Sequence, residues 1–167
     1  MTATTPVERP APKVLAIASG GGHWVQLWRM RPAWAGCRVA YATTDAGYRA
    51  EVLADAEARG EPVPGFHVVT EANRWQKLRL LRALFQVAWI VFTRRPDVVI
   101  TTGAAQGYFA LRLGRLAGAR TIWVDSIANA GELSLSGREA GRHADHWLTQ
   151  WEHLAEPDGP DYRGSVI

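Results

Sequence analysis

The sequence has 167 residues, of which 47% are hydrophobic and 21% are charged, and its formal net charge is +3. This composition is typical of one globular domain that buries a core, and it excludes a globally disordered chain. Arginine supplies all the Lys/Arg residues except Lys13 and Lys77. Arginine favours phosphate and carboxylate contacts because its planar fork donates bidentate hydrogen bonds, although a genomic bias towards Arg and Ala codons explains the usage equally well.

The N-terminal tail and the cysteine content indicate a cellular location. Residues 1–12 are rich in Thr, Ala and Pro and lack the apolar run of a signal peptide, so we expect a disordered tail and a single domain over 13–167. Cys37 has no second cysteine with which to form a disulfide, which favours a reducing cytosol. No stretch approaches the roughly 20 apolar residues that span a bilayer. We therefore expect a cytoplasmic protein whose membrane contact is peripheral or made through a partner.

Apolar runs separated by longer periodic segments predict strands and helices that alternate along the chain. The strands are expected at 13–18, 38–43, 66–70, 97–101, 121–124 and 146–149, and the helices at 24–34, 46–58, 74–93, 107–117 and 133–141. Such alternation implies right-handed βαβ units and an α/β fold with a single doubly wound, mostly parallel, Rossmann-like sheet. A Pro/Gly/Asp-rich loop at 156–164 precedes Ser165 to Ile167, which has the pattern of a short final strand.

The first predicted strand runs into Ser19, Gly20, Gly21, Gly22 and His23, a glycine turn that leads into a helix. Consecutive glycines let backbone N–H groups approach an oxyanion, and the positive end of the following helix points to the same place. This pattern favours a phosphate or diphosphate site in which a neutral His23 acts as a base or as a hydrogen-bond donor. A purely structural βα turn is the simpler alternative.

An NAD- or NADP-binding site is another alternative at this turn, because Asp45 ends the second predicted strand where a ribose-binding acid is expected. The dinucleotide fingerprint is incomplete, since Val25 occupies its third glycine position and would keep helix and strand apart. We expect no cofactor and no metal ion, because no cluster of metal-ligating residues is evident. We expect no nucleic-acid partner either.

The helix predicted over 74–93 combines a basic start with a short apolar run in which only Gln86 is polar, and Arg94 and Arg95 close it. A short apolar segment flanked by arginines and carrying tryptophans is typical of a helix that lies in a bilayer interface or docks on a membrane partner. A buried core helix with basic ends is the alternative. The residues expected to contact the membrane are Arg74, Trp75, Lys77, Arg79, Arg82 and Trp89.

Two further polar loops follow predicted strands at the edge where ligands bind in open parallel sheets. The small-residue loop 101–107 leads into a helix, and the loop 125–129 brings an acid, a hydroxyl and an amide to the same edge. Ser134 and Ser136 come directly afterwards, although capping of a helix explains them equally well. The candidate site residues in these loops are Thr102, Gly103, Gly107, Asp125, Ser126, Asn129, Ser134, Ser136 and Gly137.

Several of these segments together resemble one protein family. They are the glycine turn 19–23, the loop 102–108, the run from Asp125 to the Leu-Ser-Leu-Ser-Gly segment 133–137, and Ala144-Asp145 followed by Gln150-Trp151. They are similar to a family of accessory subunits that includes the membrane-anchoring half of the dolichol-pathway UDP-GlcNAc transferase and bacterial exopolysaccharide proteins of the PssD type. The Leu-Ser-Leu-Ser-Gly and Gln-Trp motifs are the more specific, because the glycine turn also occurs in other glycosyltransferases.

The resemblance implies that the chain is equivalent to the N-terminal half of a GT-B glycosyltransferase. It implies a protein that receives a lipid-linked saccharide at the inner face of the cell membrane, while a separate subunit binds the UDP-sugar. By the same resemblance, glycines 20–22 and His23 face the acceptor diphosphate and its reacting hydroxyl. Gln150, Trp151 and Val166 are expected to dock the partner.

Two departures from the eukaryotic pattern favour the bacterial polysaccharide branch. Eukaryotic members usually carry an N-terminal membrane span, for which the 74–93 helix would substitute, and they tend to place an arginine where Asn129 stands. The implied reaction is an inverting transfer in which His23, or Asp125 as the second candidate, deprotonates the acceptor hydroxyl. A non-catalytic membrane adaptor and a small NAD(P)-binding oxidoreductase domain are the rival functions.

Overall fold

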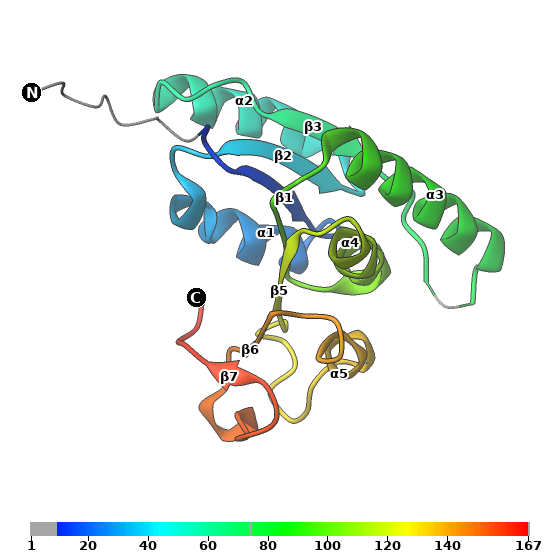
Figure 1. The fold of residues 1–167 in the computed structure, drawn as a ribbon. Coiled ribbons are helices and arrows are strands. Elements are labelled where there is room, and N and C mark those ends of the chain that lie inside the picture. Colours follow the sequence, from blue (N-terminus) through cyan, green and yellow to red (C-terminus); the bar gives the residue numbers. More distant parts are fainter. Residues whose placement is uncertain (1–9, 74, 167) are drawn as a thin grey trace, which may run out of the picture.

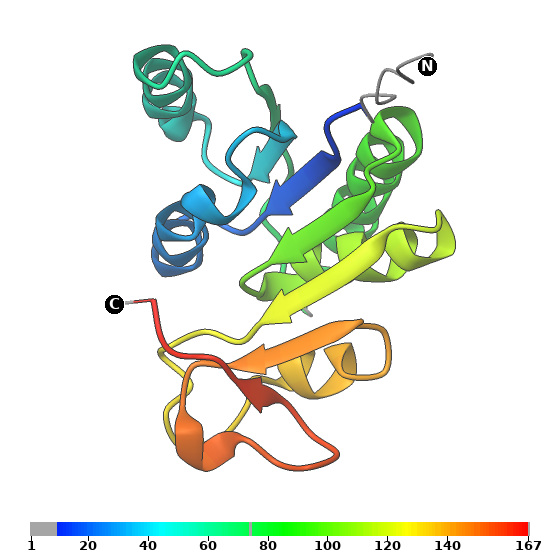
Figure 2. The same cartoon turned by 60° about the vertical axis from the view of Figure 1, so that its left-hand side comes forward.

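The computed structural model describes residues 10–73 and 75–166, which form one seven-stranded sheet in which all paired strands are parallel. The strand order is β3-β2-β1-β4-β5-β6-β7, and all the carboxyl ends lie along one edge (Figure 2). The strands are β1 (Lys13–Ile17), β2 (Arg38–Thr43), β3 (Gly65–Val68), β4 (Val98–Thr101), β5 (Arg120–Val124), β6 (His146–Thr149) and β7 (Asp161–Tyr162). The predicted α/β class and parallel sheet are confirmed.

Helices cover both faces of the sheet (Figure 1). The five α-helices of the described residues are α1 (Gly22–Arg29), α2 (Arg49–Ala58), α3 (Lys77–Arg94), α4 (Ala104–Leu116) and α5 (Leu135–Ala140). Short 3-10 helices span Arg31–Trp34, Ala46–Tyr48 and Glu152–Leu154. Helices α1 and α2 lie on one face, and α3, α4 and α5 lie on the other.

Alternation along the strands divides the core between these two faces. On β1, Leu15 and Ile17 face the layer of α3 and α4, while Val14 and Ala16 face α1 and α2. The α1 side is rich in aromatic residues, and Trp24 at its centre is 1% exposed. Both faces of β1 are buried because helices cover both sides of a parallel sheet, which is why this strand is a continuous apolar run rather than an alternating one.

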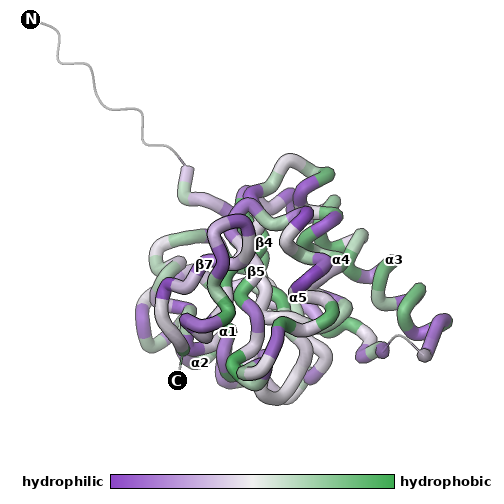
Figure 3. The backbone as a smooth tube through the Cα atoms, turned by 90° about the horizontal axis from the view of Figure 1, so that it is seen from below, coloured by the Kyte–Doolittle hydropathy of each residue, from purple (hydrophilic) through white to green (hydrophobic). Residues whose placement is uncertain are grey.

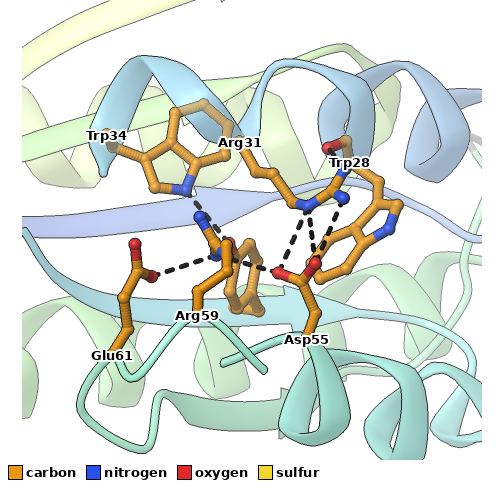
Figure 4. Close-up of polar contacts among 7 residues, drawn as sticks. Trp28, Arg31, Trp34, Asp55, Arg59 and Glu61 are labelled. Carbon is orange, nitrogen blue, oxygen red and sulfur yellow. Dashed lines mark hydrogen bonds and ion pairs between the residues drawn. The ribbon is translucent and has the colours of Figure 1, made fainter. Parts of the chain in front are cut away.

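An ionic cluster joins the far end of α1 to α2 (Figure 4). Asp55 on α2 pairs with Arg31 at 3.1 Å and with Arg59 at 2.8 Å, and Arg59 also pairs with Glu61 at 3.0 Å. Because these side chains keep contact with water, each pair stabilises the fold by no more than about 1 kcal/mol. The cluster as a whole holds the orientation of α1, whose opposite end carries the glycine turn.

Several predicted boundaries differ from the structure. Helix α1 begins at Gly22 rather than at residue 24, and it ends at Arg29 because Pro32 shifts the chain into a 3-10 turn. Helix α4 begins at Ala104 rather than at 107, so most of the loop expected at 101–107 is helical. Helix α3 begins at Lys77, and Arg74 lies outside the described residues, as do residues 1–9 of the expected tail and Ile167.

The C-terminal segment also differs from the expectation. Strand β7 lies within the region expected to be a loop, where it pairs with β6 at the edge of the sheet. Residues 165–166 form no strand. Instead, the Val166 N–H donates to Oε1 of Gln150 at 2.8 Å, so this backbone group bonds to a side chain and not to a neighbouring strand. This hydrogen bond holds Val166 at the carboxyl edge of the sheet, where β6 leads into Gln150.

Candidate acceptor site

The strand order reverses between β1 and β4, and their carboxyl ends are where ligands bind in doubly wound sheets. His23 and Thr102 join the two loops at this point through two hydrogen bonds. His23 Nδ1 lies 2.8 Å from the Thr102 carbonyl oxygen, and Thr102 Oγ1 donates to the His23 carbonyl at 2.7 Å. Since a carbonyl can only accept, the proton of this hydrogen bond is assigned to Nδ1, and Nε2 is the ring nitrogen that remains for a ligand.

Gly103 allows the His23 ring to lie close to the backbone of the loop after β4. A Cβ atom at this position would lie 2.7 Å from Cε1 of His23, and the Gly103 φ of +133° is open to glycine alone. Ala104 follows with a φ of +66°, an uncommon value for a residue with a side chain. Backbone strain of this kind gathers at ligand sites, where the surrounding structure maintains it. Thr102 and Gly103, both assigned to the acceptor from the sequence, thus lie beside His23.

The glycine turn offers fewer N–H donors than its sequence indicates. The Gly20 N–H donates to Thr44 Oγ1 at 2.9 Å and the Gly21 N–H donates to the Tyr48 hydroxyl at 3.1 Å. The donors left for an anion are those of the first turn of α1, which have no partner within the helix and which no described side chain caps. Nothing lies within 4 Å of a Cβ built on Gly22, so this end of α1 is open. Ser19, half-buried, precedes the turn.

The second helix of the site begins in the same way. Within the described part of the chain, no side chain caps the first turn of α4, and Gly103 is its N-cap residue. Because β1 and β4 are neighbours, the N-termini of α1 and α4 lie on either side of the His23–Thr102 contact. Two uncapped helix N-termini beside one imidazole present backbone N–H groups and partial positive charges that suit an anion.

The dinucleotide alternative gains no support from the geometry. Asp45 Oδ1 accepts from the Gly47 N–H at 2.8 Å and so caps the 3-10 turn that precedes α2. Val25 is 45% exposed on the outer side of α1, so it is not what separates helix from strand, and that argument was wrong. The contact that sets this spacing is Trp24, which packs on Tyr48 and Tyr41 beneath the helix.

Asp125 is 2% exposed and uses both carboxylate oxygens inside the protein. Oδ1 accepts from Trp123 Nε1 at 3.1 Å and from Ser134 Oγ at 2.7 Å. Oδ2 accepts from Asn129 Nδ2 and from the Ser134 N–H, both at 3.0 Å. A carboxylate that accepts from four donors is a fixed acceptor, and it organises the loop 125–134.

Three further residues assigned to the acceptor are packed inside the protein instead. Ser134 caps α5, with its Oγ accepting from the Gly137 N–H at 2.8 Å. A Cβ on Gly137 would lie 2.8 Å from both Asp125 Cγ and Ser134 Oγ, so glycine is needed for close packing. Gly107 lies in α4 against Thr101, whose side chain a Cβ would overlap. Gly107 and Gly137 were assigned to a ligand because turn glycines and packing glycines look alike in sequence. Ser136, half-buried, stays a candidate.

The structure of the Asp125 loop makes a direct prediction. Asp125→Asn places an amide group against two of the four donors, so we expect the free energy of unfolding to fall by about 2–4 kcal/mol. Urea denaturation measures this change. Asp158→Asn, which alters an exposed carboxylate in the loop before β7, should leave the midpoint unchanged. An Asp125→Asn protein as stable as the wild type would show that the four hydrogen bonds contribute nothing net.

Two buried glutamines lie beside the site. Gln26 was not foreseen from the sequence, and Gln150, which was expected to dock the partner, is 3% exposed. Gln26 on α1 and Gln150 after β6 bond to each other, with Gln150 Nε2 donating to Gln26 Oε1 at 2.6 Å. Gln26 Nε2 also donates to Ser126 Oγ at 3.1 Å, which places the expected Ser126 against α1 rather than in open solvent. A polar residue on the apolar face that Trp24 and Leu27 define was the available signal. Trp151 Nε1 donates to the Ile127 carbonyl at 2.8 Å.

Helix α3 has two apolar stripes, one buried as the core alternative predicts and one exposed, and contact of the exposed stripe with a membrane stays a prediction. Ala83, Val87, Ile90 and Val91 are buried against the sheet and α4. A second stripe of large side chains at helical spacing faces solvent at the edge of the molecule, where hydrophobic segments recur along α3 (Figure 3). Its members, with their exposed fractions, are Leu78 (85%), Leu81 (49%), Phe85 (66%), Trp89 (72%) and Phe92 (52%).

Basic residues flank this exposed stripe. Lys77, Arg79 and Arg82 are exposed at the start of α3, and Trp75, 78% exposed, precedes them. Phe85 and Trp89 also line an open groove of about 340 Å³ together with His67 of β3. Burial, with Arg94 and Arg49 nearby, lowers the pKa of His67, so the ring is neutral at pH 7. In the described part of the chain, no helix is long and apolar enough to cross a membrane.

The residues that the structure describes contain no group of three or more His, Cys, Asp or Glu side chains able to hold a metal ion. Cys37 is a free, partly buried cysteine that packs against the core on the α1 side. Among the described residues, the site presents an imidazole and two helix N-termini.

Comparison with known proteins identifies the family. Residues 67–166 match the family model described as "Oligosaccharide biosynthesis protein Alg14 like". The UDP-N-acetylglucosamine transferase subunit ALG14 of Eremothecium gossypii is 30% identical over 170 residues, which cover 88% of this chain and 76% of that protein. This chain belongs to the Alg14-like family. The ALG14 subunit of Yarrowia lipolytica is 36% identical over 85 residues, covering 47% of this chain and 39% of that protein.

Solved structures confirm the fold. Acinetobacter baumannii MurG superposes with a TM-score of 0.70 at 14% identity, over 93% of this chain and 46% of MurG. A UDP-N-acetylglucosamine 2-epimerase from Rickettsia bellii superposes with a TM-score of 0.61 at 15% identity, over 93% of this chain and 45% of the epimerase. The Alg14-like chain thus spans about half the length of these proteins, and its fold is that of the N-terminal half of a GT-B glycosyltransferase.

Proposed function

We propose that this Alg14-like chain is the acceptor-binding subunit of a two-component glycosyltransferase, in which a separate subunit binds the UDP-sugar. The observation that carries the proposal is the His23–Thr102 contact at the point where the strand order reverses, between two uncapped helix N-termini. Its fold equals half of a GT-B enzyme, and relatives of the family are named as subunits of UDP-N-acetylglucosamine transferase. Both facts fit a chain that requires a second half.

The acceptor fits the site through its diphosphate. The open first turns of α1 and α4 present backbone N–H groups and positive partial charge to such a group. His23 Nε2, directed away from Thr102, accepts the proton of the acceptor hydroxyl as that oxygen attacks the anomeric carbon of the UDP-sugar. The bond to the UDP oxygen breaks, UDP leaves with the electron pair, and the anomeric configuration inverts. Asp125 is committed to four donors and is a positioning residue in this scheme rather than the base.

The exposed stripe of α3 fits the surface of an anionic membrane. Large apolar side chains enter the interface between headgroups and acyl chains, and exposed arginines beside them attract anionic lipids. Trp75, Lys77, Arg79, Arg82 and Trp89 would make these contacts together with Leu78 and Phe85, which the sequence did not single out. We place the protein peripherally at the cytoplasmic face of the membrane, where a lipid-linked saccharide is accessible.

We further propose that the acceptor is a polyprenyl diphosphate saccharide of bacterial exopolysaccharide synthesis. The support is Asn129, which stands where eukaryotic members tend to have an arginine. In the structure Asn129 Nδ2 donates to Asp125 at 3.0 Å, so its amide is part of the loop at the edge of the site. A dolichol-type acceptor is the outcome that would contradict this assignment.

Reconstitution tests the function. Transfer from radiolabelled UDP-sugars to a native membrane lipid fraction is measured with this chain alone, with the candidate partner alone, and with both. We expect transfer only when both are present, because each supplies half of the active site. Transfer by the partner alone, unchanged when this chain is added, would reduce the chain to an adaptor. Lipid fractions of bacterial and eukaryotic origin, assayed side by side, distinguish the two acceptor classes.

A further inference from the structure

Gln26 and Gln150 form a buried amide pair, 6% and 3% exposed, beneath the candidate site. Every hydrogen-bonding position of the Gln26 side chain is used. Its Oε1 accepts from the Ile127 N–H at 2.9 Å and from Gln150 Nε2 at 2.6 Å. Its Nε2 donates to the Gly22 carbonyl and to Ser126 Oγ, both at 3.1 Å. One side chain therefore joins the first turn of α1 to the loop after β5.

Gln150 extends this network to the C-terminal segment. Its Nε2 makes a second hydrogen bond to the Asp125 carbonyl at 2.9 Å, and its Oε1 accepts from the Val166 N–H at 2.8 Å. An unbroken series of hydrogen bonds thus runs from Val166 through Gln150 and Gln26 to Gly22. The C-terminal segment and the glycine turn lie at the same edge of the sheet, so the series is short in space although it spans most of the chain (Figure 2).

A buried network of this kind transmits displacement. If the Val166 N–H withdraws, the Gln150 oxygen loses the hydrogen bond that this N–H supplies, and a buried acceptor without a partner is costly. The amide cannot reorient freely, because its nitrogen is held by Gln26 and by Asp125. Any movement of the Gln150 amide therefore disturbs its hydrogen bond to Gln26, and Gln26 in turn bonds to the Gly22 carbonyl. Because the surroundings of the two amides have low polarity, each of these hydrogen bonds is stronger than it would be in water, and losing one costs more.

We propose that Gln26 and Gln150 are positioning residues that couple the seating of segment 161–166 to the first turn of α1. The proposal rests on the proposed function, in which a separate subunit binds the UDP-sugar and a diphosphate binds at α1. It takes segment 161–166 as the docking surface of that subunit, as the family resemblance implies for Val166. Docking of the partner then aligns the acceptor site, so that the two half-sites become competent together. Neither glutamine contacts a reacting atom.

The test compares two changes at one position in the full chain. Val166→Pro removes the N–H while keeping an apolar side chain, and Val166→Ala keeps the N–H, so it is the matched control. Amide hydrogen exchange is measured at Ile127 and at Val25, whose N–H closes the first turn of α1 on Gly21. We expect about fivefold faster exchange at both amides in Val166→Pro and none of this effect in Val166→Ala. Exchange at Val87 of α3 should stay unchanged.

The proposal is decided by which amides exchange faster in Val166→Pro. Faster exchange confined to the neighbours of Gln150, or spread equally to Val87, would overturn the coupling. A second variant, Gln26→Met, interrupts the series, and Val166→Pro should then cause no additional change at Val25. If the two effects simply add, the coupling does not run through Gln26.

Binding of farnesyl diphosphate to the same proteins separates the coupling from the function. Val166→Pro should weaken binding by about fivefold relative to wild type, whereas Val166→Ala should bind normally. A wild-type chain that does not bind this probe, yet shows the exchange effect at Val25, would contradict the diphosphate site and leave the coupling established. Equal binding by wild type and Val166→Pro, with no exchange effect, would overturn the coupling alone.

Discussion

Replacing His23 with alanine should lower sugar transfer by the reconstituted enzyme by roughly 10²- to 10⁴-fold, the usual contribution of a general base. The physical reason is that Nδ1 is engaged by the Thr102 carbonyl, which leaves Nε2 with its lone pair as the proton acceptor. Initial rates are measured at saturating UDP-sugar and partner. His146→Ala, at the opposite end of β6 from the site, should transfer sugar at the wild-type rate.

Two further measurements separate proton transfer from the structural contact. His23→Asn keeps an N–H donor near the position of Nδ1 but provides no basic nitrogen, so it should be as impaired as His23→Ala. Recovery of transfer in His23→Asn would mean that His23 serves only to hold the two loops together. Full transfer by His23→Ala, with normal partner binding, would support the non-catalytic adaptor instead.

Removing the aromatic part of the α3 stripe should weaken binding to anionic lipid vesicles by at least about tenfold. The double variant Phe85→Ser/Trp89→Ser removes two large side chains that are 66% and 72% exposed, so the core should not change. Vesicle sedimentation measures the partition. Val25→Ser, which removes an exposed apolar side chain from α1 on the opposite face, is the matched control.

The basic residues of α3 predict a dependence on lipid charge. Arg79→Glu/Arg82→Glu should weaken binding to anionic vesicles, since each basic residue near such a surface contributes about 1 kcal/mol, and should have little effect on neutral ones. Added salt should reduce the difference. Unchanged vesicle binding by both double variants would show that the stripe does not contact lipid and would assign this face to a protein partner.

The order of elements and the positions of the polar loops were accessible from the sequence, because both depend on local patterns. Apolar runs bounded by glycine and polar loops predicted the six principal strands, and consecutive glycines before His23 predicted a helix N-terminus suited to an anion. The short strand β7 was missed because two residues in a Pro/Gly-rich segment carry no periodicity. Turn glycines and packing glycines also look alike, which is why Gly107 and Gly137 were assigned to a ligand.

The sequence by itself determined that this chain has a parallel α/β fold, a glycine turn at the start of a helix, and a second helix that is both basic and apolar. Tertiary structure decided which of those residues act together. His23 and Thr102 are 79 residues apart, and Gln26 and Gln150 are 124 apart, so their contacts depend on strand order. It also decided which stripe of α3 is buried, because a helix that is apolar on two sides does not specify its own orientation; packing against the sheet and α4 does.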